Sequence, residues 1–238
     1  MSLNKVTITG ADQSIEISDL ERLSKQFPFV EWGILFHKTK QGSPRYPTDK
    51  WVNQLRELKS RCPEVALSGH LCGQWVKEVC ESSFTFADYL DGIASIFDRF
   101  QLNMTDDRFM TLDFGVLKIR LRNFPAAILQ TKRKFQRFEW LQLLNKPGSG
   151  LPRLDMLYDC SGGKGLSPSS WAKPVDDIYC GLAGGLGPDN IESELVKIQA
   201  TVGDSDYWID MESKVRTDER FDLDKCQKVL EVCQKVIA

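Results

Sequence analysis

The stretch that decides the fold reads Leu182-Ala183-Gly184-Gly185-Leu186-Gly187-Pro188-Asp189-Asn190. An apolar strand, Ile178 to Leu182, leads into the paired glycines, and Pro188-Asp189-Asn190 opens a predicted helix. Paired glycines let backbone N–H groups approach a ligand closely, and a helix N-terminus favours an anion. Late in a chain of 238 residues, this is where a (β/α)₈ barrel holds a substrate phosphate. A Gly-Gly pair also occurs in loops that bind nothing, so the rest of the sequence must distinguish an anion site from a simple turn.

Short β-rich runs alternate with longer helical patterns along the chain, which predicts a parallel sheet. A doubly wound open sheet fits less well, because no Gly-x-Gly-x-x-Gly follows the first strand. The fold class predicted is therefore α/β: a (β/α)₈ TIM barrel of eight parallel strands surrounded by helices, forming a single domain over residues 1–238. The predicted strands are Lys5–Thr9, Glu31–Phe36, Val65–Ser68, Arg99–Leu102, Ala126–Leu129, Leu154–Tyr158, Asp177–Leu182 and Tyr207–Met211.

Helical spacing of apolar residues fills the gaps between these strands. Ser18 and Thr48 are the predicted N-caps of the first two helices. The region around 103–125 is a candidate insertion, because Thr105–Phe124 fits either a helix or a hairpin. The predicted helices are Asp19–Gln26, Asp49–Arg61, Gln74–Cys80, Asp88–Phe97, Phe135–Leu144, Asn190–Ala200 and Leu223–Ile237.

Composition limits the classes of partner. The formal charge is −2, so no global field attracts nucleic acid or an anionic membrane, and Lys132-Arg133-Lys134 fits a solvated face. The sequence has no apolar run of transmembrane length and no signal-peptide pattern. Seven cysteines without metal-ligand spacing fit buried free thiols in a reducing compartment. We therefore expect a cytoplasmic protein without a metal, either monomer or homodimer.

Motifs at four strand ends point to one family. The second strand leads to Ser43-Pro44-Arg45, the fourth carries Gln101-Leu102-Asn103, and the sixth runs Leu157-Tyr158-Asp159 into Gly162-Gly163-Lys164-Gly165. With the Leu182–Asn190 stretch, these motifs resemble phosphoribosylanthranilate isomerase, a (β/α)₈ family of tryptophan biosynthesis. The resemblance covers nearly the whole chain, and residues 63–135 match poorly.

The chemistry that this resemblance implies is an Amadori rearrangement, which converts an aminoaldose phosphate into an aminoketose phosphate. One general acid and one general base act on opposite sides of the sugar. The implied ligand is a small phosphorylated sugar, and no cofactor is required.

The implied catalytic positions include one departure from the family. Asp159 falls on the family's general acid, and burial at a strand end would raise its pKa. Thr9 stands where the family has a cysteine base, and a threonine hydroxyl is too weakly acidic for that role. His70, at the end of the third predicted strand, is one candidate substitute because its intrinsic pKa suits base work. Cys72 is another, since a helix N-terminus would lower its pKa; His37 is a weaker one.

The implied binding positions surround the same site. Arg45 matches the family arginine that recognises the anthranilate end of the substrate, and its guanidinium offers a bidentate fork to a carboxylate. Gly184 and Gly185 would present N–H groups to the phosphate, with Gly162 and Gly163 in a loop nearby. Ser213 belongs to the eighth-strand motif. There Glu212, Lys214 and Arg216 depart from the family pattern, and the two cations would compensate Glu212 or strengthen anion binding.

Two other functional hypotheses also fit the sequence. Thr9 and the altered loop after the eighth strand favour a catalytically silent barrel that binds a phosphate ligand, as a sensor or a complex subunit. A barrel phosphatase, lyase or aldolase is the third reading, with Lys132 as the lysine placed for a Schiff base.

Overall fold

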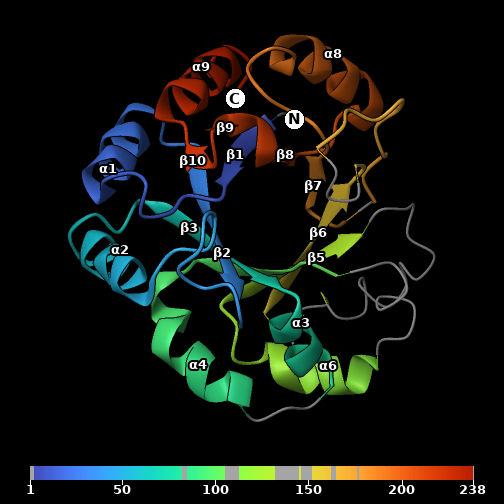
Figure 1. The fold of residues 1–238 in the computed structure, drawn as a ribbon. Helices are drawn as coiled ribbons and strands as arrows, with labels where there is room; N and C mark the ends of the chain where they lie inside the picture. The colour runs from blue at the N-terminus through green and yellow to red at the C-terminus, as the bar shows by residue number, and fades with distance from the viewer. Residues whose placement is uncertain are drawn as a thin grey trace.

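The computed structural model describes residues 3–81, 85–104, 113–131, 145, 152–161, 165–175 and 177–237. Eight parallel strands close into a barrel in chain order, with β8 pairing against β1, and helices surround it (Figure 1). The predicted TIM barrel is therefore confirmed. The strands are β1 Leu3–Thr9, β2 Val30–His37, β3 Ala66–Cys72, β4 Arg99–Leu102, β5 Ala126–Thr131, β6 Arg153–Asp159, β7 Cys180–Ala183 and β8 Tyr207–Met211.

The helices follow the predicted order. Those at Asp49–Arg61 and Gln74–Cys80 have the predicted bounds, and the ends of the other described helices differ. The stretch that fitted a helix or a hairpin contains helix α6, and the predicted helix Phe135–Leu144 lies outside the described residues. No helix among the described residues combines the length and apolarity that crossing a membrane requires. The helices are α1 Ile17–Gln26, α2 Asp49–Arg61, α3 Gln74–Cys80, α4 Thr85–Ile93, η1 Ala94–Ile96, α6 Phe114–Leu121, α8 Ile191–Val202, η2 Ser213–Val215 and α9 Leu223–Cys233. A short hairpin, β9 Arg216–Thr217 and β10 Arg220–Phe221, precedes α9.

One of the two predicted N-caps is correct. The Thr48 hydroxyl accepts a hydrogen bond from the Trp51 N–H at 3.3 Å and caps α2. The prediction of Ser18 as a cap is wrong. Helix α1 begins at Ile17, whose side chain is buried in the core, so burial of an apolar side chain starts the helix before the serine.

Strand β3 is longer than predicted, and this moves a candidate residue. It pairs with β2 in continuous register as far as Cys72, so His70 lies within the strand rather than at its end. Strand β7 starts later than predicted, at Cys180, because Asp177 adopts a left-handed conformation (φ 64°) in a turn.

The barrel interior is apolar at mid-height and ionic at the N-terminal ends of the strands. Ile128, Leu157, Ala183 and Trp208 form a cluster separate from the larger core of the molecule. At the strand beginnings, the buried Arg99 guanidinium donates to the Glu31 carboxylate at 2.7 and 2.9 Å and to Asp155 at 3.1 Å. This packed interior leaves the C-terminal face for ligand binding.

Candidate functional site

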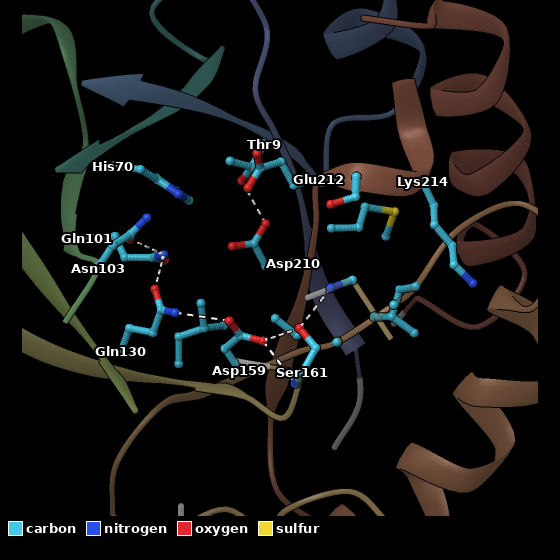
Figure 2. Close-up of a pocket in the computed structure, with 18 residues that line it drawn as sticks. Thr9, His70, Gln101, Asn103, Gln130, Asp159, Ser161, Asp210, Glu212 and Lys214 are labelled. Carbon is cyan, nitrogen blue, oxygen red and sulfur yellow. Dashed lines mark hydrogen bonds between the residues drawn. The ribbon is translucent and has the colours of Figure 1, made fainter. Parts of the chain in front are cut away.

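A pocket opens among the C-terminal ends of the strands (Figure 2). Strands β1, β3, β4, β5, β6, β7 and β8 each contribute lining residues, together with the loops after β6, β7 and β8. His70 and Lys214 lie at opposite ends of it (Figure 2).

Asp159 ends β6 and reaches the pocket as predicted. Its Oδ1 accepts hydrogen bonds from the Ser161 N–H at 3.1 Å and from the Ser161 hydroxyl at 2.7 Å. Its Oδ2 accepts one from Gln130 Nε2 at 3.1 Å. Hydrogen bonds therefore hold both oxygens of the Asp159 carboxyl group at the pocket wall.

Asp210 is a second pocket carboxyl group. Figure 2 shows it between Thr9 and Asp159, and the Thr9 hydroxyl donates to its Oδ1 at 2.7 Å. Burial raises the pKa of Asp210 well above its usual value, and the negative charges of Glu212, Glu31 and Asp159 raise it further against the Thr9 hydrogen bond. The protonated form of Asp210 is therefore more stable, relative to the ionised form, than in a solvent-exposed aspartate. Asp210 has no role in the sequence-based predictions, although it follows the apolar Ile209 at a strand end.

Side-chain amides continue the network from Asp159. Gln101 Nε2 donates to Gln130 Oε1 at 3.3 Å and to Asn103 Oδ1 at 2.7 Å. Because Gln130 donates to a carboxylate, its oxygen must face Gln101, which fixes both amide orientations. The sequence pointed to Gln101 and Asn103 only as a family motif, and it gave no signal for Gln130.

His70 lines the pocket, but burial changes its chemistry. Its Nε2 lies 3.0 Å from the Ser68 hydroxyl. Burial lowers its pKa to about 3, against the opposing negative charge of Glu31 and with a smaller contribution from Arg99. A base of that strength is ineffective near neutral pH, which argues against the expected role. Gly33 makes room for the Thr9 and His70 side chains, because a Cβ at this position would lie 2.3 Å from Thr9 Oγ1 and 3.0 Å from His70 Nε2.

Cys72 does not have the lowered pKa that the sequence predicted. Burial raises the pKa of its thiol to about 12, and the Glu212 carboxylate adds to the shift. The thiol accepts a hydrogen bond from Asn103 Nδ2 at 3.2 Å. A helix N-terminus follows at Gln74, and its effect is smaller than the cost of burying a thiolate.

The loops after β6, β7 and β8 meet beside Asp159. Gly184 and Gly185 both have positive φ angles, 144° and 60°. A Cβ on Gly185 would lie 2.3 Å from the Ser167 nitrogen, and one on Gly165 would lie 3.2 Å from Ser213. Glycine is therefore required for this convergence. Gly162 and Gly163, also predicted to bind, lie outside the described residues.

Two cationic side chains follow β8. Lys214 lines the pocket, whereas Arg216 binds the loop after β1. Arg216 is buried, donates to the Gly10 carbonyl and pairs with Asp12 at 2.8 Å. Arg216 does not line the pocket as an anion-binding cation, because its guanidinium fixes the loop after β1. Of the two expected roles it fits the compensation of Glu212, since its positive charge lowers the pKa of that carboxyl group against the effect of burial.

Arg45 makes an ion pair with Glu212. Arg45 Nη2 lies 3.1 Å from Glu212 Oε1. The backbone at Arg45 is left-handed, with φ 75°, and its N–H donates to Asp12 at 2.8 Å. Glu212 itself lines the pocket, so the guanidinium is held at the pocket edge by a carboxylate of the same chain.

The fold and this pocket define a (β/α)₈ barrel with a polar site at the C-terminal face. The chain is similar to the solved phosphoribosyl anthranilate isomerase from Thermococcus kodakaraensis, with TM-score 0.50 and 14% identity over 97% of this chain and 98% of that chain. The N-(5'-phosphoribosyl)anthranilate isomerase from Pyrococcus furiosus gives TM-score 0.57 and 14% identity over 98% and 99%.

A third similar structure is the phospho-2-dehydro-3-deoxyheptonate aldolase from Thermotoga maritima, with TM-score 0.59 and 12% identity over 98% of this chain and 68% of that chain. No protein-family model and no curated protein sequence matches the chain. At these identities the likeness shows the fold, and any activity must be argued from the pocket.

Proposed function

We propose that this protein is an isomerase of the phosphoribosylanthranilate isomerase type, converting the aldose form of a phosphorylated sugar into the ketose form. The observation that carries the proposal is the presence of two carboxyl groups, Asp159 and Asp210, in one pocket. Asp159 is arranged to accept a proton and Asp210 to hold one. Carboxyl groups in environments that separate their proton affinities are typical of acid–base pairs.

The anion end of the substrate binds in the loops after β6, β7 and β8. Support comes from the open backbone at Gly184 and Gly185, from Ser213 and from the Lys214 ammonium at the pocket wall. A phosphate there would receive backbone N–H groups and one cation. The reacting carbons would then extend toward Asp159 and Asp210.

The step is redox-neutral. The Asp159 carboxylate removes the proton from the second sugar carbon, and the C–H electron pair forms a double bond to the first carbon. Asp210 delivers its proton to the oxygen or nitrogen on that first carbon. The proton held by Asp159 returns to the first carbon, and the second hydroxyl becomes a carbonyl as its proton passes to Asp210.

This assignment makes Asp159 the base, whereas the resemblance implies that it is the general acid. Asp159 accepts hydrogen bonds on both oxygens, which suits a base, and the raised pKa of Asp210 suits an acid. Thr9 acts as a positioning residue, since its hydroxyl holds Oδ1 of Asp210 and leaves Oδ2 for the substrate.

The test is turnover of ribose 5-phosphate and of phosphoribosylanthranilate, with pH profiles of the variants. Asp210→Asn should reduce kcat by about 10²-fold or more and remove the alkaline limb, because the acid is lost. Thr9→Val should move that limb to higher pH, because the Thr9 hydrogen bond lowers the pKa of Asp210. If neither compound is turned over, or Asp210→Asn retains full activity, the proposed chemistry is refuted.

The second candidate function is a barrel that binds a phosphorylated ligand without chemistry. The hydroxyl of Thr9 at the family's cysteine position is the observation that favours it. Binding of ribose 5-phosphate that remains equally tight in Asp159→Asn and Asp210→Asn, with no turnover in the unmodified protein, would support this candidate.

A further inference from the structure

The loop after β7 carries three consecutive backbone N–H groups that lack a protein acceptor. Gly184, Gly185 and Leu186 line the pocket, and their N–H groups form no hydrogen bond within the part of the chain that the structure describes. Asn190 holds this loop, since its Oδ1 accepts from the Gly187 N–H at 2.9 Å and its Nδ2 donates to the Gly185 carbonyl at 2.8 Å. The loop therefore keeps donors that an oxyanion could satisfy.

Lys214 is seated against the same loop at Gly187. A Cβ on Gly187 would lie 2.4 Å from Lys214 Cβ and 3.0 Å from its Cδ. The first of these atoms is the base of the side chain and cannot move without the backbone, so Lys214 keeps its position only because residue 187 lacks a side chain. The backbone of Gly187 is not left-handed, so contact with Lys214 creates the need for glycine here.

The ammonium group of Lys214 is available to a ligand. It forms no ion pair with any residue that the structure describes. Burial would raise the pKa of Glu194 on α8, and hydrogen bonds from Lys197 and Trp171, with the charge of Lys214, lower it; Lys197 already pairs with this carboxylate at 2.8 Å. The carboxyl groups that line the pocket are those of Asp159, Asp210 and Glu212.

We infer that Lys214 selects the doubly charged form of the substrate's phosphate, so that the protein prefers a phosphate dianion to a singly charged oxyanion of the same shape. The inference rests on the proposed function, since it concerns the anion end of the same pocket. Backbone N–H groups bind either oxyanion, whereas a second negative charge beside pocket carboxyl groups is favoured only by a cation. Lys214 departs from the family pattern, so the resemblance does not supply this selectivity.

Two ligands of one shape isolate the second charge. Ribitol 5-phosphate is a dianion above about pH 6, and ribitol 5-sulfate is a monoanion throughout. Neither has a carbonyl group, so the proposed isomerisation cannot consume them. By calorimetry at about pH 7.5 the phosphate should bind at least about tenfold more tightly, a difference of about 1.4 kcal/mol. At about pH 5 both ligands carry about one charge and meet the same carboxyl groups, so the preference should fall below about threefold.

Lys214→Met should reduce the preference at about pH 7.5 to about threefold or less, because the phosphate loses the partner of its second charge. Lys214→Arg should retain the preference. Lys228→Met, at an exposed position on α9, changes the net charge equally and is the matched control, which should bind both ligands as the unmodified protein does.

Gly187→Ala tests the contact that seats the lysine. It should lower the preference for phosphate in the unmodified chain, because the new methyl group displaces Lys214. In a Lys214→Gly background the same substitution should have no effect on either ligand, since the methyl group then meets no Cβ.

The outcomes separate this inference from the proposed function. If the unmodified protein binds the two ligands equally at about pH 7.5, or if Lys214→Met keeps the full preference, the selectivity inference is overturned while the anion site stands. If neither ligand binds and inorganic phosphate does not compete with ribose 5-phosphate, the proposed function and this inference both fail.

Discussion

Thr9 and Asp210 show how the chemistry of one residue depends on a partner from another strand. The Thr9 hydroxyl is too weakly acidic to act as a base, yet it orients a buried carboxyl group through a 2.7 Å hydrogen bond. Holding Asp210 in this environment raises its pKa, so the ionised form destabilises the folded barrel as pH rises. A residue that is unfavourable for stability and faces a pocket is expected at a functional site.

His70 predicts a pH dependence of stability. Its pKa is about 3 in the folded chain against 6.5 when unfolded, so between these values only the unfolded chain binds the proton, and stability falls as pH falls. From pH 7 to pH 5 the histidine should contribute about 2 kcal/mol to that loss, at 1.36 kcal/mol per pKa unit below 6.5.

Urea unfolding at both pH values measures this contribution. His70→Gln should lose less stability on acidification than the unmodified protein. His37→Gln is the control, because His37 is partly exposed and its pKa is lowered less strongly. Equal acid sensitivity of His70→Gln and the unmodified protein would contradict the buried, neutral histidine.

At the residue scale, sequence motifs located Asp159 and the glycine pair because their neighbours along the chain carry the signal. Asp210 and Gln130 were given no role, because their importance arises from burial and from hydrogen bonds across the barrel. For the same reason, the pKa values of His70 and Cys72 differed from expectation. Desolvation is a tertiary effect that local sequence does not report.

At the scale of elements, the proposed anion site depends on the glycine loop between β7 and α8. Gly185→Ala should weaken binding of ribose 5-phosphate about tenfold or more, since the new Cβ would lie 2.3 Å from the Ser167 nitrogen and force the two loops apart. The left-handed backbone at φ 60° adds strain of about 1 kcal/mol.

Gly203→Ala separates these two causes. Gly203 has φ 61° at the C-cap of α8, and no atom lies within 4 Å of a Cβ placed there. This control should lose stability through backbone strain without a clash and keep its affinity for ribose 5-phosphate in calorimetry. Unchanged affinity in Gly185→Ala would exclude this loop as the anion site.

Element types were predictable because the alternation of periodicities was regular, and the eight strands were all located. The ends of the strands and helices were less predictable. Strand β3 continues through Ser68, Gly69 and His70 because β2 supplies backbone partners as far as Cys72. The predicted helix Asp88–Phe97 is instead α4 followed by η1, a division that the apolar spacing did not reveal.

At the scale of the molecule, the ionic cluster at the strand beginnings supports barrel closure. Arg99 joins Glu31 from β2 to Asp155 from β6 across the interior. Although burial alone would raise the pKa of Glu31, the positive charge of Arg99 holds it below its usual value. Arg99→Met should cost about 3–5 kcal/mol of unfolding free energy, because it leaves two buried carboxylates without this partner.

Arg153→Met provides the comparison. Arg153 also pairs with Asp155, at 2.9 Å, but its side chain is 62% exposed, so the cost should stay below about 1 kcal/mol. Urea unfolding of both variants at neutral pH gives the two values. Similar small losses would show that the Arg99 cluster does not stabilise the closed barrel.

The hydrogen bond from Thr9 to Asp210 also determines when the site can form during synthesis of the chain, because its two partners are far apart in the sequence. Its partners are 201 positions apart, and the bond from Arg216 to the Gly10 carbonyl spans 206. A ribosome would therefore complete the glycine loop of β7 before it made β8. A nascent chain ending before β8 would lack Asp210 together with Ser213 and Lys214 and could not close the barrel between β7 and β1, so the proposed acid and the proposed anion site are completed in the same step of synthesis.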